Sequence, residues 1–113
     1  MVYDPNPPFQ VFIARITLTR SRPSIGMSKF ELGRVVTTRS VAVSVDPVVT
    51  ATLVKRHASG DWGNVCEEDA QANETALAEG ERILSIYEAS GQKVYVITEA
   101  DRSHTTVLFA SEY

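Results

Sequence analysis

Cysteine is nearly absent from this chain of 113 residues, since Cys66 is the only one. A single cysteine excludes an internal disulfide, and without closely spaced histidines it makes a structural zinc site improbable. No run of about 18 apolar residues occurs, so no membrane-spanning helix is expected. The first residues also lack the basic and apolar regions of a signal peptide. We therefore expect a cytoplasmic protein with no membrane attachment, no cofactor and no metal.

Positive charge is missing from one long segment. Residues 61–81 contain seven acids and no base, whereas residues 1–26 carry three arginines against one aspartate. The formal net charge of the whole chain is −3. An acidic surface repels the phosphates of nucleic acids, so we expect no direct nucleic-acid binding through residues 61–81.

The length of the chain fits one domain with a single core. Residues 1–26 differ in charge from the rest and read as an N-terminal extension, with a possible strand over residues 9–20 followed by a linker. Met27 looks like the opening of an independent unit, and residues 27–113 are expected to form one compact α+β domain.

The first half of that domain predicts short strands followed by a helix. Strand candidates lie at residues 32–36 and 41–45, although a brief helix is also open for the second. A helix over residues 46–58 is favoured because aspartate caps helix N-termini and proline fits the first turn. Its predicted buried face consists of Val49, Leu53 and Val54, with His57 one turn on. Its many β-branched residues would suit a strand equally well.

A second helix is predicted from Glu67 to Gly80, because acids crowd its first turn and glycine favours its end. Asn73 shares a face with apolar residues at helical spacing, and we interpret it as a polar side chain that contacts a loop.

The C-terminal third predicts a three-stranded antiparallel meander. The Ser90-Gly91 pair is a hairpin turn signal between strands 82–89 and 92–99, and a third strand is expected over 105–110. This turn sets a register of cross-strand partners in which two opposite-charge pairs bracket an apolar centre. The predicted partners are Glu88 with Lys93, Ile86 with Tyr95, Leu84 with Ile97, and Arg82 with Glu99. The predicted fold is thus two helices packed on a small antiparallel sheet that ends in this meander.

The stretch from His57 to Gly63 joins the two helices and holds the only tryptophan. Two interpretations of Trp62 remain open. In the first, it plugs one end of the core, with its indole N–H on an acceptor such as Asp61, and in the second it is an exposed aromatic anchor for a partner.

Four segments resemble a family of small bacterial, plasmid and phage proteins that often carry the labels "plasmid-related protein" or "type I restriction endonuclease subunit M". The segments span residues 30–36, 56–63, 67–73 and 97–108, and the similarity covers residues 27–113. The resemblance implies a protein of mobile-element type. No sequence motif supports the label "type I restriction endonuclease subunit M", because the domain has no donor-binding or methyltransferase motif.

No nucleophile, base and acid occur in a diagnostic spacing, so no catalytic residue and no metal ligand are assigned. We expect a non-enzymatic binding or regulatory module that contacts an unidentified protein partner. The candidate contact residues are His57, Asp61, Trp62, Glu68, Asp101 and Arg102. The alternative is a small accessory factor or enzyme linked to type I restriction–modification or nucleic-acid processing, which would use His57 with Asp61 or Asp101. A second copy could also pair with an open sheet edge to form a homodimer.

Overall fold

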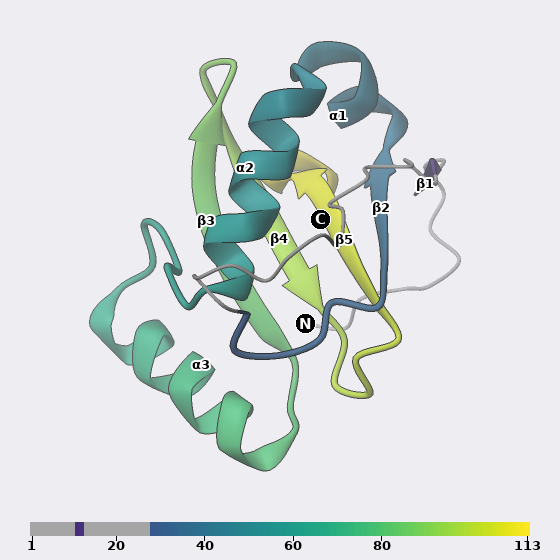
Figure 1. The fold of residues 1–113 in the computed structure, drawn as a ribbon. Helices are drawn as coiled ribbons and strands as arrows, with labels where there is room; N and C mark the ends of the chain where they lie inside the picture. The colour runs from purple at the N-terminus through teal and green to yellow at the C-terminus, as the bar shows by residue number, and fades with distance from the viewer. Residues whose placement is uncertain (1–10, 13–27) are drawn as a thin grey trace.

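The computed structural model describes residues 11–12 and 28–113 of the chain. Its elements in chain order are β1 (Val11–Phe12), β2 (Arg34–Thr38), α1 (Arg39–Ser44), α2 (Pro47–Ala58), α3 (Glu67–Glu79), β3 (Ile83–Ala89), β4 (Gln92–Thr98), β5 (His104–Phe109) and the 3-10 helix η1 (Ala110–Glu112). Figure 1 shows α2 lying across one face of the sheet and α3 beside one end of it. The fold is α+β, as the sequence predicts.

The strands form one sheet in the order β1-β2-β5-β4-β3. The meander of β3, β4 and β5 is antiparallel, as predicted. β2 pairs in parallel with β5, however, so the sheet is mixed and the prediction of a purely antiparallel sheet is wrong. Three helices and two strands separate β2 from β5, and a connection of that length allows two neighbouring strands to run in the same direction.

The register predicted for the first hairpin of the meander is confirmed. Glu88 lies opposite Lys93, Ile86 opposite Tyr95, and Leu84 opposite Ile97. Both turn residues have positive φ, 54° at Ser90 and 73° at Gly91, as a two-residue type I′ turn requires. Arg82 and Glu99 lie just outside the two strands and form an ion pair of 3.5 Å.

The stretch predicted as a strand over residues 41–45 is the helix α1. In a strand, Val41, Val43 and Val45 would all lie on one face. In a helix, only Val41 and Val45 lie on the same side, because they are one turn apart. Val41 and Val45 are buried, whereas Val43 between them is 74% exposed. The Oγ1 atom of Thr38 caps the helix by accepting a hydrogen bond from the Val41 amide. The preceding strand correspondingly begins two residues later than predicted, at Arg34.

The predicted helix over residues 46–58 is α2. The Asp46 carboxylate accepts a hydrogen bond of 2.8 Å from the Val48 amide, so the expected cap is present. Leu53 and Val54 are buried as predicted, but Val49 is 40% exposed and Thr50 occupies the core side in its place. Packing of this face against the sheet outweighs the weak helix propensity of the β-branched residues.

The second predicted helix is α3. It begins at Glu67 and ends at Gly80, which caps it in the left-handed conformation at φ 70°. Asn73 and Ala76 are its buried residues.

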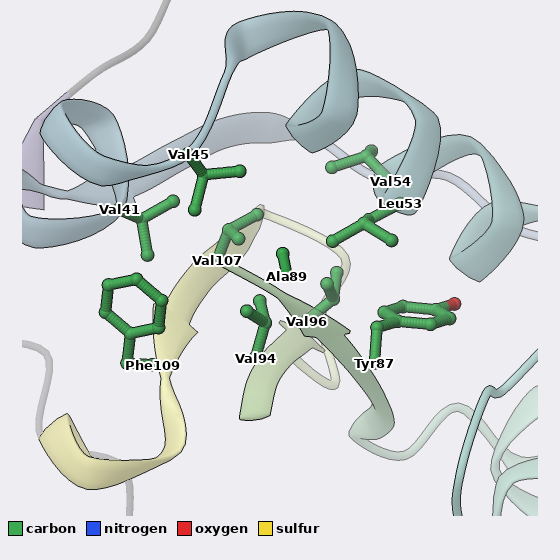
Figure 2. Close-up of a cluster of buried hydrophobic side chains, with 10 residues drawn as sticks. All are labelled: Val41, Val45, Leu53, Val54, Tyr87, Ala89, Val94, Val96, Val107 and Phe109. Atoms are coloured by element: carbon green, nitrogen blue, oxygen red, sulfur yellow. The ribbon is translucent and has the colours of Figure 1, made fainter. Parts of the chain in front are cut away.

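The main hydrophobic core lies between the sheet and the two helices α1 and α2. Figure 2 shows how side chains from both layers meet there. The buried members are Val41, Val45, Leu53, Val54, Tyr87, Ala89, Val94, Val96, Val107 and Phe109. Burying a side chain of this size stabilises the fold by about 1.5–3 kcal/mol.

A second, smaller cluster attaches α3 to the end of the sheet. Trp62, Ala76 and Ile83 are its buried members, with Phe30 and Leu77 among the half-buried residues packed on them. The interpretation of Trp62 as a buried plug is therefore confirmed, although the residue belongs to this separate cluster.

Part of the predicted N-terminal extension belongs to the described structure. Val11 and Phe12 form β1, which pairs antiparallel with the end of β2. The rest of the possible strand over 9–20 and the linker to residue 26 lie outside the described residues. Within the part of the chain that the structure describes, no helix combines the length and the apolar character needed to cross a bilayer.

Candidate functional site

The structure distributes the six predicted contact residues over two different environments. His57 and Trp62 are buried, at 0% and 6% exposure. Glu68, Asp101 and Asp61 are exposed, and Arg102 is half-buried. The six side chains therefore do not form one continuous contact surface.

His57 lies inside the fold in a chain of buried polar groups. Its Nδ1 is 2.5 Å from Ser85 Oγ, and its Nε2 is 2.9 Å from Thr98 Oγ1. Thr98 Oγ1 in turn lies 2.6 Å from Thr105 Oγ1, which donates to the Leu32 carbonyl. This network of hydrogen bonds connects α2 to three strands and to the segment that precedes β2.

The Leu32 carbonyl at the end of this network fixes the direction of the hydrogen bonds from Thr105 back to His57 Nε2. A carbonyl only accepts, so the Thr105 hydroxyl proton is used there and Thr98 must donate to Thr105. Thr98 then accepts from His57 Nε2–H, so the imidazole carries a proton on Nε2. Burial favours the neutral imidazole, in which Nδ1 is bare and accepts from the Ser85 hydroxyl.

Burial, together with the positive charge of Arg102, lowers the pKa of His57 from 6.5 to about 3. Desolvation disfavours the charged imidazolium. Ser85, Thr98 and Thr105 are also fully buried, so this histidine and its neighbouring hydroxyls are enclosed and hold the fold together. A general base must instead reach the proton of a bound substrate.

A serine, a histidine and an aspartate at the β4–β5 connection do come together, but in the wrong order for a catalytic triad. Ser103 Oγ lies 3.0 Å from His104 Nδ1, and the Ser103 amide donates to Asp101 Oδ1 at 3.0 Å. In a triad the acid orients the histidine from the side opposite the serine. Here the carboxylate binds the serine residue, and that hydroxyl and amide hold the pKa of Asp101 below its ordinary value.

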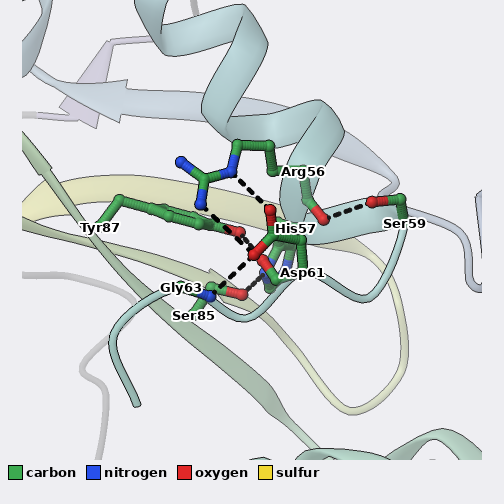
Figure 3. A network of polar contacts seen from close by, with 7 residues as sticks. All are labelled: Arg56, His57, Ser59, Asp61, Gly63, Ser85 and Tyr87. Atoms are coloured by element: carbon green, nitrogen blue, oxygen red, sulfur yellow. Dashed lines mark hydrogen bonds and ion pairs between the residues drawn. The ribbon is translucent and has the colours of Figure 1, made fainter.

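Asp61 closes the loop after α2, as Figure 3 shows. Its carboxylate forms a two-pronged contact with Arg56, at 2.7 Å to Nε and 3.3 Å to Nη2, and accepts a hydrogen bond of 3.2 Å from the Gly63 amide. The hydrogen bond from Arg56 is the main reason that the pKa of Asp61 is lowered. The Tyr87 hydroxyl donates to the Asp61 carbonyl, so the loop is also tied to β3.

Trp62 is held by α3 and by aromatic neighbours. Its Nε1–H donates to Glu74 at 3.0 Å, so the acceptor is this carboxylate and not Asp61. The ring stacks on Phe30 with a centroid distance of 6.3 Å and meets His57 edge-on at 6.1 Å. These contacts make Trp62 the link between α2, α3 and the chain before β2.

Arg102 is occupied by backbone carbonyls. Its guanidinium donates to the carbonyls of Glu81 at 2.7 Å, Glu99 at 3.1 Å and Ala76 at 3.2 Å. The backbone of Arg102 has φ 59°, a left-handed conformation that is unfavourable for a residue with a Cβ. Arg102 therefore anchors the end of α3 to the connection between β4 and β5.

The outer edge of β3 is occupied over its central residues, which the sequence does not reveal. The Asn73 side chain accepts from the Leu84 amide at 3.1 Å and donates to the Leu84 carbonyl at 2.7 Å, so it imitates a neighbouring strand. Two residues along, the Ile86 amide donates to the Trp62 carbonyl and the Ile86 carbonyl accepts from the Asn64 amide. A second copy could not pair with these backbone groups without displacing both contacts.

The exposed surface that the sequence analysis missed consists of three valines, which we call the valine patch. Val43 on α1 is 74% exposed, and Val48 and Val49 in the first turn of α2 are 72% and 40% exposed. Among the described residues, these are the large apolar side chains that face solvent. For Val48 and Val49, the available signal was the run of β-branched residues in a segment predicted to be helical.

Within residues 11–12 and 28–113, no three histidine, cysteine, aspartate or glutamate side chains are grouped so that they could hold a metal ion.

The described residues form an α+β domain in which buried hydrogen bonds around His57 connect the helix α2 to the sheet. Comparison with protein-family models, with characterised proteins and with solved structures finds no match.

Proposed function

We propose that this chain is a non-enzymatic binding or regulatory module that contacts a protein partner through the valine patch. The mobile-element character of the proposal comes from the resemblance alone. The observation that carries the binding function is the exposure of Val43, Val48 and Val49 on two neighbouring helices.

Exposed valine on a helix is unfavourable for the isolated chain. Valine is a weaker helix former than alanine by about 0.5 kcal/mol per residue. A buried valine regains this through packing, but at 72–74% exposure Val43 and Val48 regain little. Residues that break a local rule without a compensating contact in the folded chain are expected at functional sites.

The alternative of a small enzyme finds less support. The histidine on which it depends, His57, is enclosed and neutral, and Asp61 is engaged with Arg56. We therefore keep the protein-binding function as the only proposal.

The contact surface proposed from the sequence is also revised. The exposed members of that set are Asp61, Glu68 and Asp101, but Trp62 cannot serve as an anchor while it is only 6% exposed. Hot spots of interfaces are most often large side chains that enter a pocket of the partner.

The test is affinity purification of the tagged full chain from producing cells, with Val48→Glu as the variant and Ala72→Glu on α3 as the matched control. Both changes place a carboxylate at an exposed helical position. A carboxylate in the first turn is favourable for the helix, so Val48→Glu should not lower the melting temperature. We expect wild type and Ala72→Glu to retain the same specific partner and Val48→Glu to lose it. A partner retained by Val48→Glu would contradict this surface.

A further inference from the structure

The β3–β4 hairpin has a second face, on the side of the sheet away from α1 and α2. We propose that this face pairs with the same face of a second copy of the chain. The inference concerns a surface separate from the valine patch and does not rest on the proposed function.

The residues of this face follow from the alternation of side chains along a strand. Tyr87 on β3 and Val96 on β4 belong to the main core, so the residues next to each of them point to the opposite side of the sheet. The residues on that side are Leu84, Ile86 and Glu88 of β3 and their cross-strand partners Ile97, Tyr95 and Lys93 of β4. We call these six residues the hairpin face.

The middle of the hairpin face is apolar and partly accessible. Ile86 and Tyr95 lie opposite each other and are both half-buried. The ring of Tyr113 meets Tyr95 edge-on, with a centroid distance of 5.5 Å. Towards the other end, Ile97 is 1% exposed, so its side chain is already covered. The accessible apolar surface therefore lies around the Ile86–Tyr95 pair.

Two opposite charges adjoin this pair on the side of the hairpin turn. Glu88 and Lys93 lie opposite each other and are both exposed, yet neither forms an ion pair with another of the described residues. A partner that carries charge of one sign would attract one of these groups and repel the other. The matching partner must offer a lysine opposite the glutamate and a glutamate opposite the lysine.

A second copy offers this arrangement through symmetry. Sheets pack face to face about 10 Å apart with their strands nearly aligned. A two-fold axis that runs parallel to the strands, midway between β3 and β4, places β3 of each copy over β4 of the other. Each residue then meets the type of residue that is its cross-strand partner, so Glu88 meets Lys93 of the second copy and Ile86 meets its Tyr95. The two-fold axis repeats each contact.

The contact is made by side chains and not by strand edges. The outer edge of β3 is occupied at Leu84 by Asn73 and at Ile86 by the loop that follows Trp62. Pairing through the hairpin face leaves all of these hydrogen bonds in place. Because the face consists of parts of two short strands, the interface belongs to the small and weak class, and we expect a reversible dimer at about 0.1–1 mM protein.

The test is sedimentation equilibrium of the full chain at low ionic strength, where exposed charges are weakly screened. Glu88→Lys gives each copy two lysines at this position, and Lys93→Glu gives each copy two glutamates. We expect either variant alone to dimerise more weakly than wild type by about 10-fold or more, because two attractive contacts become repulsive. An equal mixture of the two variants should dimerise at about the wild-type level, since every lysine then meets a glutamate of the other variant.

Glu79→Lys is the matched control, because it makes the same change of charge at an exposed position at the end of α3. This variant should dimerise as wild type does, and so should Val48→Glu, which alters the valine patch. Restoration in the mixture also shows that both hairpin variants are folded.

Four results would overturn the inference. A wild-type chain that stays monomeric up to about 1 mM removes the second copy as occupant. A dimer that neither hairpin variant weakens, or that Glu79→Lys weakens equally, belongs to another surface or to net charge. A dimer that Val48→Glu disrupts belongs to the valine patch. Failure of the mixture to dimerise refutes the two-fold arrangement.

Discussion

Lowering the pH from 7.5 to 4.5 is expected to destabilise the folded chain through His57. The imidazole has a pKa of 6.5 when it is solvated and about 3 in the folded protein, chiefly because burial disfavours its charged form. Between these values the unfolded chain binds a proton that the folded chain does not. The stability contributed by neutral His57 is therefore complete above pH 6.5 and is lost as the pH falls towards 3.

The magnitude follows from the size of the shift. Each pH unit below 6.5 costs about 1.4 kcal/mol until the folded pKa is reached. At pH 4.5 the loss is about 2.7 kcal/mol, a substantial part of the 5–15 kcal/mol by which domains are usually stable. The pKa values of Asp61 and Asp101 are lowered from 3.8, so the stability that these two carboxylates contribute is lost mainly below pH 4.5.

The assay is urea unfolding of the full chain at several pH values between 7.5 and 4.5. His57→Gln keeps a polar side chain that does not titrate, so it should cost about 1–3 kcal/mol at pH 7.5 and abolish most of the pH dependence. His104→Gln keeps His57 and should keep the slope. If wild type is as stable at pH 4.5 as at pH 7.5, or if His57→Gln shows the same slope, the buried neutral histidine is refuted.

Three further predictions concern the contacts that hold α3 and its loop. Trp62→Ala should destabilise the fold by about 3–5 kcal/mol and lower the melting temperature by more than about 8 °C in calorimetry, and an unchanged melting temperature would place the indole outside the core. Asn73→Leu should leave the Leu84 amide and carbonyl without partners, which costs about 1–3 kcal/mol for each group. The exposed edge of β3 should then promote self-association in sedimentation, whereas the exposed control Gln71→Leu should neither destabilise the fold nor associate. Gly63→Ala should lower the melting temperature far more than Gly91→Ala, because both residues have positive φ but only at Gly63 would a Cβ collide with the backbone of β3; equal effects in thermal denaturation would contradict the close approach.

The candidate site was only partly predictable from sequence. The six proposed contact residues were chosen for chemical type, and His57 and Trp62 proved to be interior residues. A polar side chain is satisfied inside a fold when hydroxyls and carbonyls from distant segments reach it, as Ser85 and Thr98 do for His57. The valine patch was hidden for the converse reason, because the spacing of valines in residues 41–45 suits a strand until the helix α1 turns Val43 outwards.

The sequence by itself determined the features that depend on neighbouring residues. Local backbone preferences account for the cap at Asp46, the end of α3 at Gly80 and the Ser90-Gly91 turn. The Ser90-Gly91 turn then sets the register of β3 with β4. Only the tertiary structure decided the parallel pairing of β2 with β5 and the burial of His57 and Trp62. These features depend on contacts between segments far apart in the chain, whose free energy exceeds that of local preferences and is not written in any single stretch of sequence.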